Sequence, residues 1–153
     1  MGLNTTHGCW DGGYSGFAMF RHAVGLAAGL PYRKPNPFWH EYGADVLDID
    51  WSRITERQIE GYWDRKGPTV FLGIYGPPRT DPALYLLVHS DCDGKLRRGY
   101  LPDLKARLEE IEPEFERIIP TMPPGYHHLG GRLRTFINGL AKAIEAGEHV
   151  EFH

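Results

Sequence analysis

The sequence lacks the features that mark secreted and membrane proteins. No apolar run approaches the roughly 18–20 residues of a membrane-spanning helix, and the opening MGLNTTHGCWDG has neither the basic nor the apolar region of a secretory signal. The two cysteines, Cys9 and Cys92, are too few for a disulfide framework and are typical of reduced thiols in a cytosol. We therefore expect a cytoplasmic protein with no membrane partner.

The sequence also lacks any basic run longer than a pair of residues. Its 17 Lys and Arg residues are interspersed with 20 Asp and Glu residues, which gives a formal net charge of −3. Proteins that bind polymeric nucleic acid neutralise its phosphates with a basic stripe, so we expect no such partner. A small anionic ligand needs only one or two cations, so the charge pattern does not exclude a ligand of that kind.

The length and composition are those of one compact domain over residues 1–153. Apolar residues recur at helical spacing in three segments, and Asp81 followed by Pro82 is typical of a helix start. We therefore expect a mainly α fold, of the α+β kind with at most a small sheet. The expected helices cover residues 14–29, 101–112 and roughly 130–146, and Gly147 is expected to cap the last of them.

Shorter patterns predict the remaining elements. Residues 46–50 alternate in hydrophobicity and residues 70–75 are β-branched and aromatic, so both segments are candidate strands. Ser52 can cap a further helix that runs through Trp63. Residues 1–13 are small, polar and rich in glycine, which is typical of an ordered loop.

The first candidate site is the segment NTTHGCWDG at residues 4–12, which leads through Tyr14 and Ser15 into the first expected helix. In one interpretation His7 and Asp11 face a pocket, and the N-terminus of the helix receives an anion. His7 then acts as an acid or base and Asp11 orients it. In the other interpretation Asp11 only caps the helix, and His7 is a hydrogen-bonded core residue. Both interpretations stay open on the sequence alone.

The second candidate site is the segment HSDCDGKL at residues 89–96, between two expected helices. With Gly94 at the sixth position of an EF-hand loop, the two aspartates take the third and fifth positions, which predicts an EF-hand-like helix-loop-helix. His89 at the first position and Tyr100 at the twelfth depart from that pattern, and two carboxylates with an imidazole suit a transition metal better than calcium. The candidate ligands of a divalent metal are His89, Asp91 and Asp93. Alternatively the loop is an empty turn whose carboxylates bind backbone amides, or these carboxylates act directly in acid–base chemistry.

The other histidines and the cysteines are weaker candidates. His127 and His128 are adjacent and lack the i, i+4 spacing of a helical zinc pair, so we expect them on the surface together with the histidines of the tail. His22 and His40 are expected to fill the core or the surface. Each cysteine can be a nucleophile beside the histidine of its own motif. The sequence contains no G-x-S-x-G, G-x-G-x-x-G, Walker A, C-x-x-C or H-E-x-x-H motif.

Three segments of this chain resemble an uncharacterised family of small bacterial and bacteriophage proteins: LNTTHGCWDGGYSGF, HSDCDGKL and FINGLAKAIEAGEHVEFH. Lys95 stands where the family usually has Glu, and residues 31–80 match only loosely. The resemblance implies no particular activity. It does imply that His7, Asp11, His89, Asp91, Cys92 and Asp93 belong to one pattern, which favours a shared pocket. In a phage protein such a pocket would fit counter-defence in the host cytoplasm.

We therefore expect a pocket protein for a small molecule, most simply a hydrolase of a phosphorylated or nucleotide-like compound, with or without a metal ion. The catalytic candidates are His7, Asp11 and His89. The ligand-binding candidates are Trp10, Tyr14, Ser15, Cys92 and Arg97. One alternative is a non-catalytic protein that sequesters a nucleotide signal, and a second is an inhibitor of a protein–protein interaction. The sequence leaves the cofactor and the oligomeric state open.

Overall fold

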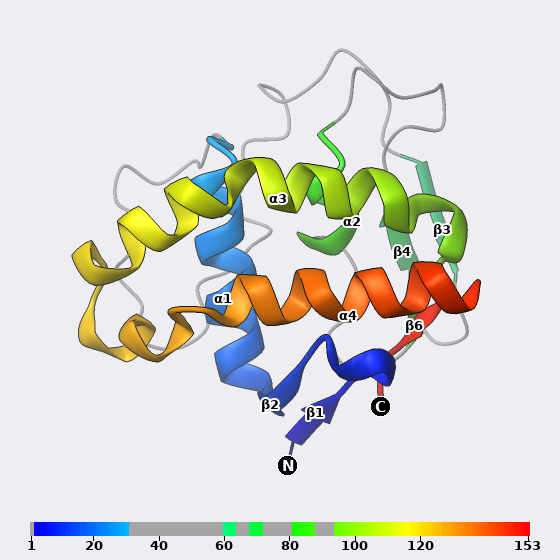
Figure 1. Ribbon diagram of the computed structural model, residues 1–153, viewed down its shortest axis with the longest axis horizontal. Helices are drawn as coiled ribbons and strands as arrows, with labels where there is room; N and C mark the ends of the chain where they lie inside the picture. Colours follow the sequence, from blue (N-terminus) through cyan, green and yellow to red (C-terminus); the bar gives the residue numbers. More distant parts are fainter. Residues whose placement is uncertain (1, 31–59, 64–67, 72–80, 88–93) are drawn as a thin grey trace.

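The computed structural model describes residues 2–30, 60–63, 68–71, 81–87 and 94–153 (Figure 1), and in residues 60–63 and 68–71 the backbone alone. This part of the chain is mainly helical, as expected. Its α-helices are α1 (Tyr14–Ala27), α2 (Ala83–Leu87), α3 (Leu101–Ile118) and α4 (Arg132–Ala146). Its strands are β1 (Gly2–Asn4), β2 (Asp11–Gly13), β3 (Glu60–Trp63), β4 (Pro68–Phe71), β5 (Lys95–Leu96) and β6 (Val150–Glu151). Short 3₁₀ helices are η1 (Thr6–Gly8), η5 (Arg98–Tyr100), η6 (Ile119–Thr121) and η7 (Pro124–Leu129).

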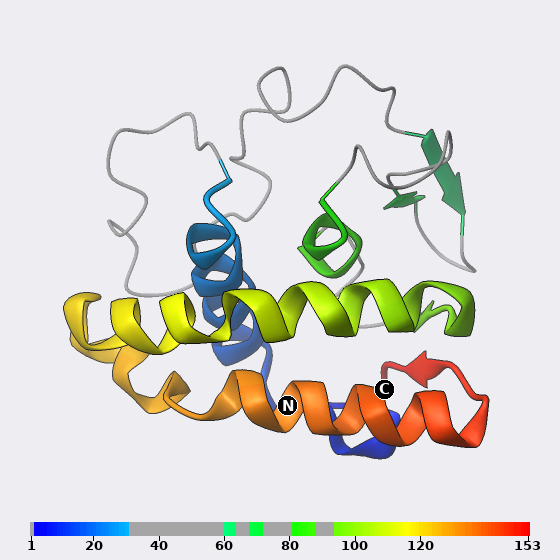
Figure 2. The ribbon, with the colours of Figure 1, turned by 45° about the horizontal axis from the view of Figure 1, so that its top comes forward.

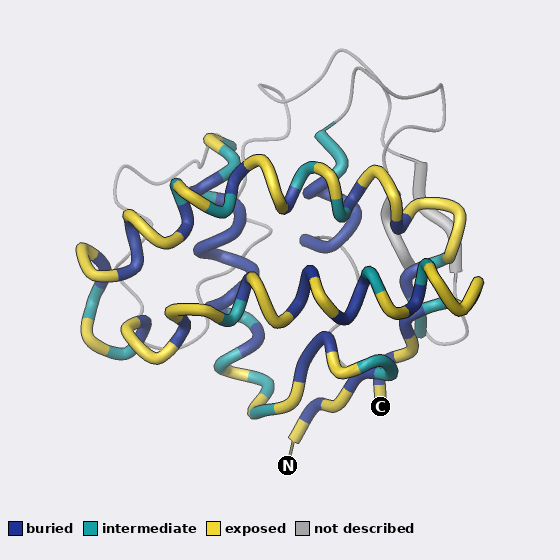
Figure 3. Tube along the Cα trace, in the orientation of Figure 1, coloured by how far each residue is buried: buried dark blue, intermediate teal, exposed yellow. Residues whose placement is uncertain are grey.

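Helices α3 and α4 lie side by side and antiparallel, and α1 crosses both (Figures 1 and 2). The reason is visible in the sequence, because each helix carries an apolar stripe that is buried in this arrangement (Figure 3). Phe20 of α1 is fully buried at the crossing, and its ring centroid lies 5.9 Å from that of Phe115 and 5.5 Å from that of Phe136. These rings join the three long helices into one core.

The three helices expected from apolar spacing are confirmed, and so are two of the expected caps. The side chain of Asp81 accepts a hydrogen bond from the backbone N–H of Ala83 at 2.9 Å, at the start of α2. Gly147 ends α4 with a left-handed φ of 69°, a conformation that glycine adopts without a Cβ penalty.

Other expectations are wrong. Helix α3 continues past residue 112 to Ile118 with Pro113 inside it, because Phe115 and Ile118 extend the buried stripe while Pro113 lies on the exposed side. Residues 60–63 form β3, which pairs antiparallel with β4, so the helix expected to run through Trp63 is wrong there. The strand expected at 70–75 is confirmed for Val70 and Phe71. The expected strand at 46–50 and residues 52–59 lie outside the described residues.

The expected ordered loop at residues 1–13 is instead a hairpin of β1 and β2 with η1 between them. An antiparallel bridge between Thr5 and Phe152 joins this hairpin to the β5–β6 pair. Backbone hydrogen bonds of 3.1 and 2.8 Å link Asn4 and His153 in both directions, so the first and last described residues lie together. None of the helices in the described ranges combines the length and the apolar character needed to cross a membrane.

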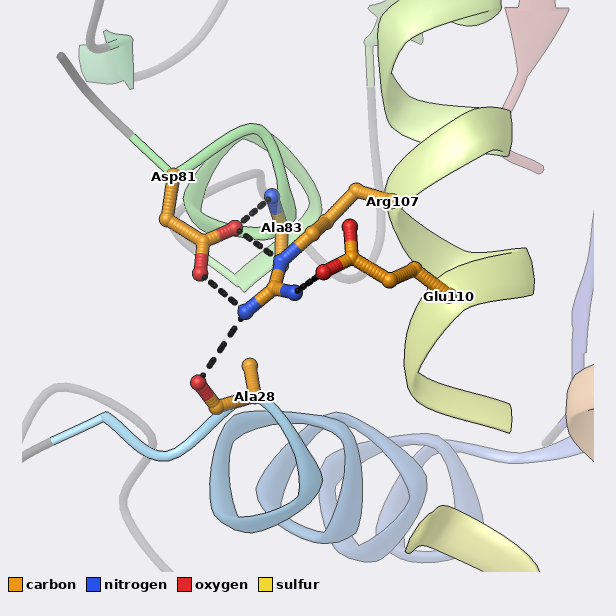
Figure 4. A network of polar contacts seen from close by, with 5 residues as sticks. All are labelled: Ala28, Asp81, Ala83, Arg107 and Glu110. Carbon is orange, nitrogen blue, oxygen red and sulfur yellow. Dashed lines mark hydrogen bonds and ion pairs between the residues drawn. The ribbon is translucent and has the colours of Figure 1, made fainter. Parts of the chain in front are cut away.

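A polar network centred on Arg107 of α3 holds α1, α2 and α3 together (Figure 4). The guanidinium binds the Asp81 carboxylate with two hydrogen bonds of 3.0 and 2.9 Å and donates to the carbonyl of Ala28 at 3.1 Å. Glu110 adds an ion pair of 3.1 Å. Because the side chains of Arg107 and Asp81 are only 21% and 16% exposed, this network stabilises the packing more than a surface ion pair would.

Candidate functional site

The N-terminal motif lies along α4 and is fixed to it in the middle. Cys9 is buried against Gly139, so closely that a Cβ on Gly139 would stand 2.7 Å from the Cys9 backbone nitrogen. On one side of this contact His7 pairs with Glu148, just beyond the end of α4, and on the other the carbonyl of Asp11 accepts from Arg132, at the start of α4. Helix α4 has 15 residues and is therefore about 22 Å long. His7 and Asp11 thus lie toward opposite ends of α4 and do not form the expected pair.

His7 has an unusual backbone and a defined partner. Among the residues that the structure describes, it is the one non-glycine residue with a positive φ, at φ 60° and ψ 8°. Its Nε2 atom lies 2.9 Å from a carboxylate oxygen of Glu148, and its side chain is 17% exposed. Left-handed backbone at a non-glycine residue persists only when its surroundings fix it, and such residues concentrate at functional sites. Thr6 helps to fix this turn, because its hydroxyl accepts a hydrogen bond from the backbone N–H of Glu151 at 2.9 Å.

His149 lies beside the same turn and is held as a neutral imidazole. The backbone N–H of Arg98 donates to its Nδ1 at 2.8 Å, which requires that Nδ1 be unprotonated and leaves Nε2 to carry the hydrogen. Partial burial lowers the pKa of His149, and the positive charges of Lys95, Arg98 and Arg97 lower it further. These three residues form a basic cluster around His149, whose neighbour in the chain, Glu148, pairs with His7.

The C-terminal strand connects this turn to the end of the HSDCDG segment. Thr5 bridges to Phe152, whose backbone N–H donates to the carbonyl of Gly94 at 3.0 Å. Neighbouring strands are about 4.8 Å apart, so Gly94 lies about 10 Å from the backbone of Thr5. The candidate residues His89, Asp91, Cys92 and Asp93 lie outside the described residues. Among the described ranges, no group of three or more His, Cys, Asp and Glu side chains could hold a metal ion.

Trp10, a ligand-binding candidate, is a core residue here. It is 2% exposed, and its ring lies 5.2 Å from that of Phe17 and 5.1 Å from that of Phe20 between centroids. The guanidinium of Arg132 covers the ring at 4.6 Å from its centroid. Trp10 therefore has no open face on which a ligand could stack.

The expectation that Asp11 caps the first helix is wrong. Helix α1 begins at Tyr14 with Gly13 as its N-cap residue, and no described side chain caps it. Asp11 is two residues too early because it is held in β2, opposite Asn4. Its side chain and that of Ser15 are exposed, and Tyr14 is half-buried.

The two remaining chemical candidates in the described part are structural. Burial raises the pKa of the Cys9 thiol to about 12, which disfavours its use as a nucleophile. Cys9 is a free thiol. His22 fills the core and shares a hydrogen bond of 3.0 Å with the hydroxyl of Tyr126, and burial lowers its pKa to about 4. The adjacent His127 and His128 are exposed, as expected, and His40 lies outside the described residues.

Glu148 and Arg132, which contact the N-terminal motif by an ion pair and a hydrogen bond, were not among the candidates from the sequence. The signal for Glu148 was present in the tail EHVEFH, where an acidic residue follows the Gly147 cap directly. The comparisons with protein-family models, curated proteins and solved structures gave no match to this chain. Its function must therefore be inferred from the geometry of these residues.

Proposed function

We propose that this chain is an enzyme that hydrolyses a phosphorylated or nucleotide-like small molecule. Its site lies where η1, β5 and the residues before β6 meet. The observation that carries the proposal is the His7–Glu148 pair. His7 has a left-handed backbone conformation, and its Nε2 atom lies 2.9 Å from the Glu148 carboxylate. A histidine oriented by a carboxylate is a common acid–base unit, and Glu148 takes the orienting role that the sequence assigned to Asp11.

In this proposal the pairing of Nε2 with Glu148 leaves Nδ1 to exchange protons. His7 Nδ1 takes a proton from water as the water oxygen attacks phosphorus. The bond from phosphorus to the leaving oxygen breaks, and the proton passes from His7 to that oxygen. Glu148 stabilises the imidazolium that exists between these two transfers.

The basic cluster beside His7 fits a phosphorylated ligand. Arg97 is half-buried, and the hydroxyl of Tyr85 accepts a hydrogen bond of 2.9 Å from its backbone N–H, which fixes the start of the cluster. Lys95 and Arg98 lie next to it in the chain, and all three act on the pKa of His149. Guanidinium groups bind phosphate oxygens in a bidentate manner, so Arg97 keeps its proposed ligand-binding role.

The EF-hand-like helix-loop-helix at HSDCDG belongs to the same proposal. Gly94 has a φ of 90°, as the sharp turn at the sixth position requires, and Leu96 at the eighth position is buried. Tyr100 at the twelfth position lies exposed in η5 and has no carboxylate, so the calcium arrangement is incomplete. His89, Asp91 and Asp93 would hold a divalent transition metal, which would supply Lewis-acid activation of a phosphate oxygen or of water.

Two other functions remain as alternatives. The basic cluster would also serve a protein that sequesters a nucleotide signal without turnover, because phosphate binding does not require His7. The third hypothesis, inhibition of a protein–protein interaction, predicts an exposed apolar patch. Within the described ranges Tyr100, at 38%, is the one exposed large hydrophobic residue, so this part of the surface gives that hypothesis no support. A role in phage counter-defence is compatible with the first two functions.

The first test is hydrolysis of bis(p-nitrophenyl) phosphate and of p-nitrophenyl phosphate, with added Mn²⁺ and with EDTA. We expect His7→Gln to lower kcat by about a hundredfold or more, and Glu148→Gln by about tenfold, because general acid–base catalysis contributes roughly 10²–10⁴-fold. Glu145→Gln, at an exposed position near the end of α4, is the matched control and should leave the rate unchanged. Full activity of His7→Gln would refute the assigned role.

Binding separates the enzyme from the sequestering protein. In calorimetric titrations with adenosine monophosphate, His7→Ala and Asp91→Asn should still bind the nucleotide while their turnover disappears. Native mass spectrometry of protein purified without chelator is the companion measurement. Added mass of a metal ion supports the HSDCDG ligand set, whereas a nucleotide-sized adduct that survives purification favours sequestration.

A further inference from the structure

The start of α1 is an open helix terminus surrounded by glycine. Gly13 is its N-cap residue and no described side chain caps it, so the amides of the first turn keep their hydrogen-bonding capacity. This helix has 14 residues and therefore a positive field at its N-terminus. A glycine also stands at position 12 before the helix and at position 16 in its first turn. These glycines add no side chain of their own at the start of the helix.

A buried donor points at the same place. Trp10 is 98% buried, its relative exposure being 2%, and its indole Nε1 has no hydrogen-bond partner among the described residues. A Cβ built on Gly12 would have Trp10 Nε1 at 3.4 Å and Arg132 Nη2 at 3.2 Å. Both nitrogens thus lie beside Gly12, and the third nearest atom to that Cβ position is a ring carbon of Trp10. A buried donor without an acceptor is costly, which makes an acceptor within reach of these two nitrogens favourable.

One guanidinium and one imidazole lie near these glycines. The guanidinium of Arg132 has five N–H donors, and its hydrogen bond to the carbonyl of Asp11, at 2.8 Å, occupies only one of them. A Cβ built on Gly16 would lie 3.5 Å from Trp10 Cζ2 and 3.7 Å from His128 Nε2, so the indole and the imidazole both lie beside the first turn of α1. The carboxylate of Asp11 does not oppose this field directly, because Asp11 and Gly12 are neighbours in β2 and face opposite sides of the strand.

We propose that the start of α1 binds a phosphate-type oxyanion, held by the first-turn amides, Trp10 Nε1 and Arg132. One oxygen of the anion accepts from Nε1 and from the guanidinium, which turns aside from its place over the indole ring to admit it. The other oxygens accept from the amides of Tyr14, Ser15 and Gly16, as at other helix N-termini that bind phosphate. The expected anion-binding and ligand-binding roles of Trp10, Tyr14 and Ser15 are thereby met through backbone amides and the indole N–H instead of through stacking.

This site goes beyond the proposed function. It is built around Arg132 at the start of α4, whereas His7 pairs with Glu148 beyond the other end of that helix. Its ligand can be free phosphate or the phosphoryl group of a larger molecule, and the shared chemistry is a tetrahedral oxyanion. A result here therefore leaves the hydrolase proposal unaffected, and failure of that proposal leaves this one standing.

The test is a titration of ¹⁵N-labelled protein with inorganic phosphate, followed in amide and indole N–H spectra. Trp10→Phe identifies the indole signal of Trp10. We expect this signal and the amide of Gly16 to shift together along one saturating curve. Arg132→Gln should raise the Kd for phosphate by about tenfold or more, since one charge-assisted hydrogen bond is lost. Arg134→Gln is the matched control, because Arg134 is exposed on the same helix and pairs with Glu112.

A second variant adds a methyl group beside the first-turn amides of α1 without disturbing the fold. Gly16→Ala places a methyl group at ordinary contact distance from Trp10 and His128, so the protein should fold and lose phosphate binding. His7→Ala should leave the shift of the Trp10 signal unchanged, which distinguishes this site from the basic cluster. An unchanged Kd in Arg132→Gln, or a Trp10 signal that does not respond to phosphate, would overturn the proposal. Adenosine monophosphate with a much lower Kd than phosphate would identify a larger phosphorylated ligand as the source of the anion.

Discussion

Replacing Gly139 by alanine tests the contact that positions the N-terminal motif. A Cβ at this position of α4 would lie 2.5 Å from the sulfur of Cys9 and 2.7 Å from both its Cα and its backbone nitrogen. Two of these three atoms belong to the backbone, so rotation of the Cys9 side chain cannot relieve the overlap. The segment that carries Cys9 must move away from α4.

The size of the effect follows from two opposing terms. Alanine in a helix interior is favoured over glycine by about 1 kcal/mol. Overpacking a close contact costs about 1–3 kcal/mol. Because the overlap at Gly139 involves backbone atoms, we take the cost there at the upper end, about 3 kcal/mol. We therefore expect the Gly139→Ala variant to lose about 2 kcal/mol in free energy of unfolding. At roughly 2–4 °C per kcal/mol for a chain of this size, its Tm should fall by about 4–8 °C.

Gly16→Ala is the matched control, because it makes the same chemical change in another helix. Its Cβ would lie at ordinary contact distances of 3.5 and 3.7 Å from its nearest neighbours, so only the helix preference remains. We expect a gain of up to about 1 kcal/mol. Urea unfolding followed by circular dichroism measures both variants. A Gly139→Ala protein as stable as the parent would show that Cys9 does not need its close approach to α4, and the argument for the placement of His7 would fail.

Three further predictions concern the buried polar groups. Burial lowers the pKa of His22 from 6.5 to about 4. The contribution of neutral His22 to the free energy of unfolding is therefore complete above pH 6.5, and up to about 3 kcal/mol of it is lost as the pH falls to 4. Urea unfolding at a series of pH values should show this loss in the parent protein and not in His22→Gln. Arg107→Ala should lose about 1–3 kcal/mol of unfolding free energy, whereas Arg117→Ala should lose clearly less, because its ion pair is exposed and screened by water; equal losses would contradict the network. In a Cys92→Ser background, Cys9 should react with a thiol reagent only after unfolding, because burial raises its pKa to about 12; rapid labelling of native protein would refute that burial.

The helices were predictable because their signals are local. The stripe of Leu104, Leu108 and Ile111 has helical spacing, and the caps Asp81 and Gly147 act within a few residues of the elements they bound. The length of α3 was not predictable by the same rules. Pro113 is a helix breaker by propensity, but the burial of Phe115 and Ile118 against the other helices outweighs the hydrogen bond that proline removes.

The sequence was enough to single out the residue types of the candidate site, but not to predict which residues contact one another. His7 and the N-terminus of the first helix were recognised as chemical features, but their partners Glu148 and Arg132 lie more than 120 residues away in the chain. Those contacts depend on the bridge between Thr5 and Phe152, which brings the two ends of the described chain together. Strand pairing of this kind leaves no periodic signal in segments of two or three residues.

The position of Cys9 explains why residues of one continuous motif contact both ends of α4. Its buried contact with Gly139 divides the segment, so that His7 extends toward the end of α4 and Trp10 toward its start. The segment turns back on itself between Asn4 and Asp11, with His7 in the turn, yet the contacts of His7 and Asp11 are made with residues at opposite ends of α4. The proposed proton-transfer group and the proposed anion-binding helix start are therefore neighbours in sequence but lie toward different ends of α4.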